Sequence, residues 1–233
     1  MTREGGRFFH WLKRSVFLAL FLAFFFGVPA SAMTPATISV GQITNPLSVI
    51  IYVGDSRTYA LYSMGSASRK VNDVFISKGG GVVEEILKYP LYSYLKAAIK
   101  RFPSAPVILN FGVNGMQGNE DGKNIVLVYQ KLFKSFPRTR FFVESINPTA
   151  FRAGIHSNRK VLAINKTLSR SFPGRYIDCY NYLLNKGIVN LNGTKGFLSR
   201  DRLHYNWATC REILTATRGW ITVKLTGHAL TRK

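Results

Sequence analysis

Acidic residues and cysteines are scarce in this chain of 233 residues, and each shortage narrows what the protein can be. There are 11 Asp and Glu residues against 32 Lys and Arg, which gives a formal charge of +21. The only two cysteines, Cys179 and Cys210, lie in no Cys-x-x-Cys pair and no Cys/His cluster, which argues against a zinc site. In an oxidising compartment they could form a disulfide or remain two separate buried thiols, and the sequence leaves both alternatives open.

The sequence also lacks internal repeats, low-complexity segments and linkers that would separate two domains. With 46% hydrophobic residues the chain can bury one good core, and single α/β domains commonly have this size. We therefore predict one domain over residues 47–226, with an N-terminal lead-in over 33–46 and a basic C-terminal tail over 227–233.

The first 32 residues have the parts of a secretory signal peptide. A basic segment comes first, an unbroken apolar run follows from Ser15 to Val28, and Ala30-Ser31-Ala32 has the form of a cleavage site. The apolar run is shorter than the roughly 20 residues that a membrane-spanning helix needs. We expect cleavage after Ala32 and export to the periplasm or the cell exterior, whereas an uncleaved leader would anchor the protein in the membrane.

The chain stays strongly basic without this leader. Removal of its four basic residues and of Glu4 leaves a formal charge of +18, which attracts polyanions. Since the basic residues are scattered and no nucleic-acid module is recognised, we expect no specific nucleic-acid partner. For an exported protein the expected polyanions are envelope polymers or anionic lipid head groups, and the alternative is that the charge only serves solubility.

Short apolar segments alternate with segments of helical periodicity along the mature chain. We expect strands or apolar runs over 47–53, 74–77, 106–115, 139–148 and 176–180. We expect helices over 82–102, with Pro90 kinking or splitting the first, and over 125–136, 161–172 and 210–225. This alternation predicts a mostly parallel sheet covered by helices on both faces, which is a three-layer α/β/α sandwich.

The first of these strands runs into the sequence Gly54-Asp55-Ser56-Arg57, after which the pattern becomes helical. In such sheets ligands bind at the carboxyl ends of the strands, so Ser56 is a candidate nucleophile. The alternative is that Asp55 or Ser56 only caps the helix. A nucleophilic serine needs a base, a group that orients the base, and donors for the developing oxyanion.

Three later segments carry residues of these types. The second strand is followed by Gly79-Gly80-Gly81, whose backbone N–H groups can approach a substrate oxygen closely because glycine has no Cβ. Asn114 follows the third apolar run, and its amide could donate a second hydrogen bond. Asp201 and His204 lie three residues apart, so on a helical turn the carboxylate could orient the imidazole. Taken singly, each segment also fits an ordinary loop, a turn asparagine or a solvated surface turn.

In this order and spacing, the segments "GDSR", "KGGG", "GVNG" and "DRLH" resemble the four signature blocks of the SGNH hydrolases, the GDSL-type esterases and lipases. The resemblance extends from about Val49 to Trp207, and the first and last blocks are its most specific parts. It implies a flavodoxin-like α/β/α fold and a Ser-His-Asp esterase that works without a metal or another cofactor.

The resemblance also implies a role for each site residue by its position in a block. The catalytic residues would be Ser56 as nucleophile, His204 as general base and Asp201 as the group that orients it. The oxyanion donors would be the backbone N–H of Ser56, a glycine N–H and the Asn114 amide. Gly80 is the first choice for the glycine and Gly81 the second.

Three residues depart from the family pattern or add to it. Arg57 replaces the leucine of the first block, as in bacterial envelope members of the family, and adds a cation beside the nucleophile. Gly115 stands where the family commonly has Asp, so a side chain that helps to fix the Asn114 loop is missing. Arg202 could lower the pKa of Asp201 or could shape a site for an anionic substrate.

The expected protein is an exported bacterial serine esterase that hydrolyses an acyl or O-acetyl ester, with an O-acetylated envelope glycan as the expected substrate. Two alternatives stay open. One is a catalytically inactive protein of the same fold that binds anionic envelope polymers. The other is an acyltransferase that passes an acyl group to a glycan through the same residues.

Overall fold

A computed structural model describes residues 35–66, 72–116, 121–151, 154, 156–198 and 201–226. The predicted signal peptide and the predicted basic tail lie outside the described residues. The domain boundaries therefore stay predictions.

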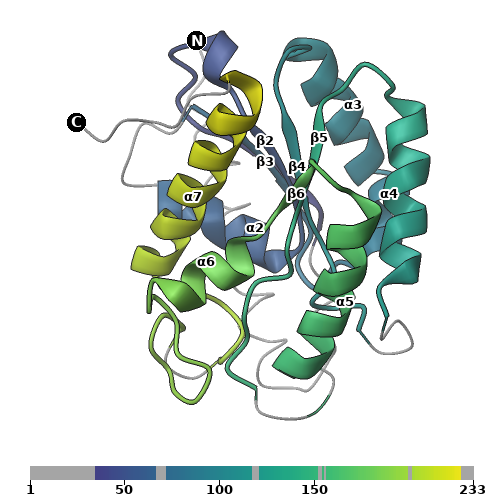
Figure 1. The fold of residues 1–233 in the computed structure, drawn as a ribbon. Helices are drawn as coiled ribbons and strands as arrows, with labels where there is room; N and C mark the ends of the chain where they lie inside the picture. The colour runs from purple at the N-terminus through teal and green to yellow at the C-terminus, as the bar shows by residue number, and fades with distance from the viewer. Residues whose placement is uncertain are drawn as a thin grey trace.

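A six-stranded sheet forms the centre of the protein (Figure 1). Its strands are β1 (Thr37–Val40), β2 (Ile51–Gly54), β3 (Val74–Ser77), β4 (Val107–Asn110), β5 (Phe141–Glu144) and β6 (Tyr176–Ile177). They lie in the order β1-β3-β2-β4-β5-β6, and every neighbouring pair is parallel except β1 with β3. Without β1, this is the strand order of flavodoxin-like sheets, in which ligands bind where the order reverses, here between β2 and β4.

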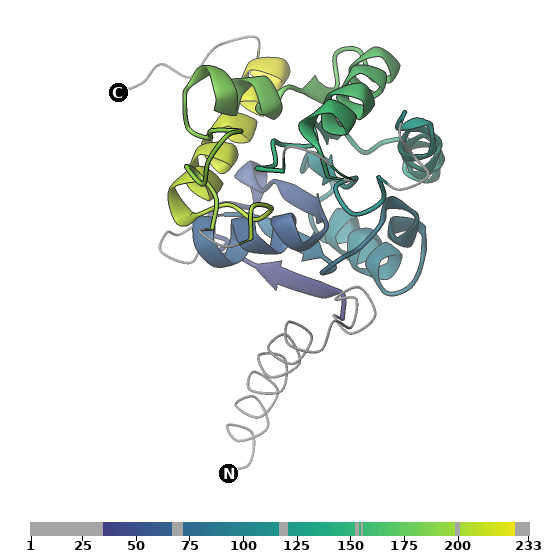
Figure 2. The same cartoon turned by 90° about the horizontal axis from the view of Figure 1, so that it is seen from below.

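Helices cover both faces of the sheet and complete three layers (Figures 1 and 2). The longer ones are α3 (Leu91–Arg101), α4 (Lys123–Ser135), α5 (Asn158–Ser171) and α7 (Trp207–Thr226). The shorter ones are η2 (Pro46–Ser48), α2 (Ser56–Ala60), the π-helix η3 (Leu61–Ser66), η4 (Val83–Leu87) and α6 (Cys179–Asn185). The predicted fold class, a mostly parallel α/β/α sandwich, is confirmed.

Alternate residues of the strands pack into two separate hydrophobic cores, one on each face of the sheet. Ile51 and Val53 of β2 pack with α3, α4 and α5 on one face. Tyr52, between them, packs on the other face with α2, α6 and α7. Since both faces are covered, the parallel strands are apolar throughout rather than alternating, which is why they appear in the sequence as continuous apolar runs.

Three predicted elements need correction. The first strand begins at Ile51 rather than at residue 47, because Asn45 caps a short 3-10 turn over η2. The last strand has two residues rather than the five predicted over 176–180, because the Asp178 carboxylate accepts the backbone N–H of Asn181 and starts α6. The predicted lead-in contains β1, an edge strand that had not been expected. Pro90 does split the first long helix, into η4 and α3.

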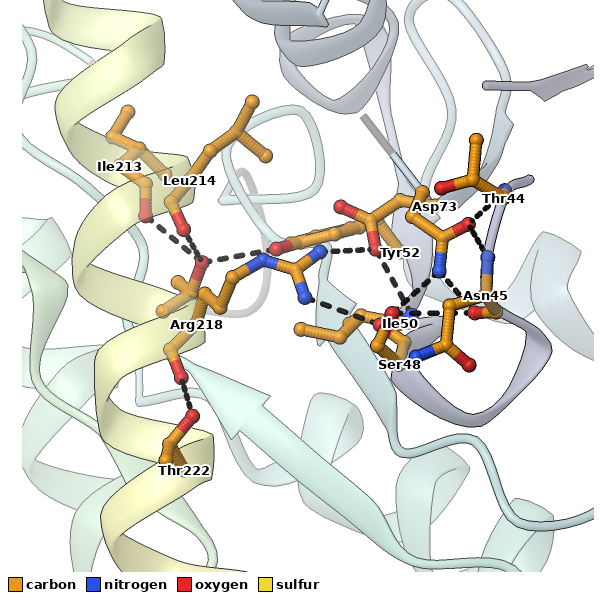
Figure 3. A network of polar contacts seen from close by, with 12 residues as sticks. Thr44, Asn45, Ser48, Ile50, Tyr52, Asp73, Ile213, Leu214, Arg218 and Thr222 are labelled. Carbon is orange, nitrogen blue, oxygen red and sulfur yellow. Dashed lines mark hydrogen bonds and ion pairs between the residues drawn. The ribbon is translucent and has the colours of Figure 1, made fainter. Parts of the chain in front are cut away.

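The end of the sheet where β2 and β3 begin is tied to α7 by a polar network (Figure 3). Asp73 is buried, and its Oδ1 accepts the backbone N–H of Ile50 at 3.0 Å and Nη2 of Arg218 at 2.5 Å. The same guanidinium donates to the carbonyl of Ser48 at 3.1 Å. The network fixes the C-terminal helix against the N-terminal loop, and it gives the Arg218 cation a carboxylate partner.

Cys179 and Cys210 are two separate buried thiols, each packed in the core on the α7 face of the sheet. The structure thus adopts the second of the two alternatives that the sequence left open. Among the described residues, none of the helices combines the length and the apolar composition that crossing a membrane requires.

Candidate active site

The turn from β2 into α2 positions Ser56. A Cβ on Gly54 would lie 2.2 Å from Thr58 Oγ1 and 2.4 Å from the carbonyl oxygen of Asn110, so only glycine fits there. Asp55 is the N-cap of α2, and its Oδ1 accepts the backbone N–H of Arg57 at 2.9 Å. Ser56 is therefore the first residue of the helix, directly beyond the carboxyl end of the central strand.

Ser56 and His204, which lie far apart in the sequence, meet at this edge of the sheet. Oγ of Ser56 lies 2.7 Å from Nε2 of His204. The other ring nitrogen of His204, Nδ1, is hydrogen-bonded to Oδ2 of Asp201. The structure thus brings the three predicted catalytic side chains into one continuous chain of hydrogen bonds. Asp55 also caps the helix, so helix capping and a nucleophilic Ser56 are compatible within one turn.

Asp201 is positioned by hydrogen bonds to backbone N–H groups of the residues that follow it, rather than by a helix. Residues 201–204 form a turn and not the helical turn expected from the spacing, because Oδ1 of Asp201 accepts the backbone N–H groups of Leu203 and His204, each at 2.7 Å. Burial acts to raise the pKa of Asp201, but the hydrogen bond and charge of His204 outweigh it, so the pKa of this carboxyl is lowered. The carboxylate is therefore ionised at neutral pH and accepts from the imidazole.

Two backbone N–H groups follow the carboxyl ends of the neighbouring strands β2 and β3. As the first residue of α2, Ser56 contributes an N–H that has no acceptor within its helix. Gly79 and Gly80 are the central residues of a turn closed by a hydrogen bond of 3.0 Å from Gly81 N–H to the Lys78 carbonyl. Gly80 has φ +64°, which glycine adopts without strain. The Gly81 N–H closes the turn and Gly81 is buried, whereas Gly80 is partly exposed, so the first choice of Gly80 as a donor stays a prediction that this geometry allows.

Asn114 connects the second and third blocks. Its Nδ2 donates to the carbonyl of Gly81 at 3.2 Å, which holds the side chain beside the glycine turn and leaves the second amide proton of this group for another acceptor. A Cβ on Gly115 would approach no atom closer than 3.7 Å, to Val82. A Cβ at this position therefore meets no steric conflict, and the Gly81 contact holds Asn114 although residue 115 has no side chain.

Arg57 is buried beneath the nucleophile, only 4% exposed, rather than placed as a free cation beside it. Its guanidinium donates to the carbonyls of Asn147 at 2.9 Å and Pro148 at 3.2 Å, and lies 5.0 Å from the centre of the Tyr205 ring. The Tyr205 hydroxyl donates to the same Pro148 carbonyl. The neighbours of the nucleophile and of the base are thus joined through one short segment, a connection that the sequence analysis missed.

Two buried carboxyl groups lie near this arginine. Asp55 and Glu144 are each 1% exposed, and burial raises the pKa of both, while the Arg57 charge opposes the increase. For Glu144, whose Oε1 accepts from Nδ2 of Asn147 at 2.6 Å, the pKa rises to about 7. Near neutral pH the charge of this cluster therefore depends on the protonation of Glu144.

This raised pKa predicts how stability changes with pH. The folded state keeps a proton on Glu144 up to about pH 7, whereas the unfolded carboxyl loses it near its ordinary value of 4.5. Between these values the folded state binds more protons, so the free energy of unfolding should fall as the pH rises, by up to about 1.4 kcal/mol per pH unit. Glu144→Gln does not titrate and should lose this part of the slope.

Urea unfolding of the wild type and Glu144→Gln between pH 4.5 and 8 checks the expectation. The difference between the two free energies of unfolding should shift in favour of the variant as the pH rises, and then level off above about pH 7. Glu212→Gln on α7, whose carboxylate accepts from the Tyr182 hydroxyl, is the matched control. A difference between Glu144→Gln and wild type that is independent of pH would contradict the raised pKa.

Arg202 lies in the turn between Asp201 and His204. It has φ +56°, its side chain is exposed, and its carbonyl accepts the backbone N–H of Ala150 at 2.8 Å. With Ala150 and residues 192–194 it lines a hollow of about 330 Å³. The lowered pKa of Asp201 is caused by His204 and by the backbone N–H of Leu203, so the other role predicted for Arg202, that of shaping a site for an anionic substrate, stays a prediction.

The fold is similar to those of solved lipolytic proteins. A member of the lipolytic G-D-S-L family from Veillonella parvula is 17% identical over 77% of this chain and 98% of its own, with a TM-score of 0.54. A lipase from a goat rumen metagenome is 13% identical over 74% of this chain and 96% of its own, with a TM-score of 0.53. No protein-family model and no curated protein matches the sequence. At these identities the likeness concerns the fold, and it confirms the SGNH-type fold that the four blocks predicted.

Proposed function

We propose that this protein is a serine esterase of the SGNH type. The observation that carries the proposal is the hydrogen-bonded chain from Ser56 Oγ through His204 to Asp201, at the carboxyl end of the central strand. A serine that only capped a helix would not need an imidazole 2.7 Å from its hydroxyl, nor a carboxylate on the far side of that imidazole.

In the proposed reaction Ser56 Oγ attacks the carbonyl carbon of an ester while its proton passes to Nε2 of His204. The carbonyl oxygen becomes an oxyanion, which accepts from the backbone N–H groups of Ser56 and Gly80 and from the Asn114 amide. His204 then gives its proton to the leaving alcohol as the ester bond breaks. Water, deprotonated by His204, attacks the acyl-serine and releases the acid by the same steps.

For the substrate we propose an ester on an envelope carbohydrate, such as an O-acetyl group on a glycan. This part rests on the predicted export and on the strongly positive charge of the chain. Release of acetate from O-acetylated cell-wall material by the wild type, and not by Ser56→Ala, would support it. Turnover confined to lipid esters or thioesters would contradict it. N-terminal sequencing of the protein recovered from outside the cytoplasm would test cleavage after Ala32.

Replacing Asn114 by alanine tests the proposed oxyanion site. Loss of one such donor typically slows turnover by about two to three orders of magnitude, and we expect this decrease in kcat on p-nitrophenyl acetate. Asn114 is partly exposed, so the variant should stay folded.

Gly115→Ala is the matched control in the same loop. Its added Cβ meets nothing closer than 3.7 Å, so its turnover should stay close to that of the wild type. Equal turnover of Asn114→Ala and Gly115→Ala would remove Asn114 from the proposed site. The urea unfolding midpoints of both variants show whether the loop change has affected the fold.

A further inference from the structure

One side of the sheet carries helices with many cations and almost no carboxylates. Between Glu85 and Asp178 the only acidic residues are Glu120, Asp121 and Glu144. Of these, Glu144 is buried, and Asp121 pairs with Lys123 at 2.8 Å at the start of α4. The rest of α3, α4, α5 and the segments that lead from them into β4, β5 and β6 have basic residues and no acidic ones.

The topology gathers many of these cations at the end of the sheet opposite the candidate active site. Each of the three helices runs back along the sheet and ends where the next strand begins (Figure 1). We call the exposed basic residues at this end the cationic end: Lys100, Arg101, Lys131, Lys134, Arg138, Arg140, Arg170 and Arg175.

Hydrogen bonds show that the loops of the cationic end are neighbours. The carbonyl of Arg140 accepts from Val107 N–H and that of Arg175 accepts from Val143 N–H, each at 2.9 Å, so the two arginines lie at the starts of adjacent strand pairs. Nη2 of Arg140 donates to the Ser104 carbonyl at 2.6 Å, and the Arg175 guanidinium lies 5.3 Å from the centre of the Phe133 ring. Each guanidinium thus has a contact within the protein, and a side chain that is already restrained loses less conformational entropy on binding.

No carboxylate neutralises these cations within the described part of the chain. The ion pairs found there involve Lys78, Lys123, His204 and Arg218, and none of them belongs to the cationic end. The contrast with Arg218 is direct, because that cation has the Asp73 carboxylate as its partner (Figure 3). Basic residues in the last turn of a helix interact favourably with its dipole, but Arg138, Arg140 and Arg175 lie beyond the helices.

The arrangement and the residue types of the cationic end favour one class of polyanion over others. Neighbouring strands lie about 4.8 Å apart, so cations at the starts of three strands form a row that suits a linear chain better than a single small anion. Five of the eight residues are arginines, whose planar forks match phosphate oxygens. The segments that carry these cations, 100–106, 131–140 and 170–175, contain no exposed aromatic to stack on bases and no large exposed apolar residue to enter a bilayer.

We propose that the cationic end is a non-catalytic binding surface for a linear polymer that carries phosphate groups along its backbone and has no bases. Such a contact would hold the protein on a polyanionic envelope polymer while the active site, at the other end of the sheet, stays open to its substrate. The proposal does not depend on the esterase activity.

The test compares two variants with the same change in charge. The first carries Lys100→Gln, Lys131→Gln, Lys134→Gln and Arg138→Gln. The control carries Lys88→Gln, Arg159→Gln, Lys186→Gln and Lys195→Gln, exposed positions away from this end of the sheet. The probe is inorganic polyphosphate, with binding measured by calorimetry at low and moderate salt on the Ser56→Ala background as well as on the wild type.

We expect the first variant to bind polyphosphate about tenfold more weakly or worse, with a shallower dependence on salt, and the control to bind nearly as the wild type does. Ser56→Ala should bind unchanged, and both charge variants should keep wild-type turnover of p-nitrophenyl acetate. Equal losses in the two variants would mean that net charge alone acts, which overturns the proposal. Tighter binding to oligothymidylate, or to vesicles of equal parts phosphatidylcholine and phosphatidylglycerol, would also overturn it.

Discussion

Replacing Ser56 by alanine is expected to abolish labelling by a fluorophosphonate and to reduce turnover of p-nitrophenyl acetate by about four orders of magnitude or more. The reason is geometric, since Oγ of Ser56 is the hydroxyl at 2.7 Å from the imidazole that would take its proton. The fold should be unaffected, because Asp55 and not Ser56 caps the helix. Labelling followed by mass spectrometry of the modified peptide measures the effect at the residue itself.

Two further variants sharpen this experiment. His204→Ala keeps the nucleophile but removes its base, so labelling should still occur and be greatly slowed. Ser135→Ala, whose hydroxyl donates only to the Lys131 carbonyl on the exposed side of α4, should label as the wild type does. Persistent labelling of Ser56→Ala would eliminate Ser56 as the nucleophile. A folded wild type that does not label would favour the inactive binding protein among the alternatives.

Replacing Arg57 by leucine should produce the largest loss of stability. The substitution leaves Asp55 and Glu144 buried without the cation that opposes the rise of their pKa. It also removes the donor of the Asn147 carbonyl and one of the two donors of the Pro148 carbonyl, which keeps the Tyr205 hydroxyl. Removing one member of a buried charged group typically costs about 3 to 5 kcal/mol, which we expect for the free energy of unfolding at pH 8. At pH 5 the loss should be smaller, because Glu144, with a pKa of about 7, is then protonated and needs no counterion.

Urea unfolding at the two pH values measures this loss. Arg57→Lys keeps the charge but cannot present a planar fork to the Asn147 and Pro148 carbonyls, so it should recover only part of the stability. Arg159→Leu on the exposed side of α5 is the matched control and should change the free energy of unfolding by less than about 0.5 kcal/mol. A loss for Arg57→Leu as small as that of the control would show that the buried cluster does not stabilise the fold.

The sequence predicted the fold because the strands of a doubly covered sheet are apolar at every position. The runs around Val53, Ile76 and Leu109 could be recognised on that basis. The edge strand β1 could not, because only one neighbour pairs with it and its residues alternate between half-buried and exposed. The two-residue strand β6 was overestimated because the capping effect of Asp178 outweighs the apolar pattern that follows it.

Only those site residues that lie in short sequence blocks could be predicted from the sequence. The spacing of Asp201 and His204 indicated a pair, although the structure achieves the pairing through a turn in which Asp201 accepts backbone N–H groups. The contact of Arg57 and Tyr205 with Pro148 could not be predicted, since it joins three segments whose only link is their packing in space. An arginine beside a candidate nucleophile suggests an exposed cation, and only its burial shows that it supports the fold.

The two buried thiols have a practical consequence for all of these variants. Burial raises the pKa of Cys179 and raises that of Cys210 to about 12, so both stay protonated at neutral pH and are shielded from alkylating reagents, which attack the thiolate. Cys179 lies on α6 and Cys210 on α7, so modification of either requires this side of the sheet to open. The rate of thiol alkylation in native buffer therefore measures how often this side of the sheet opens, and the measurement needs no introduced label.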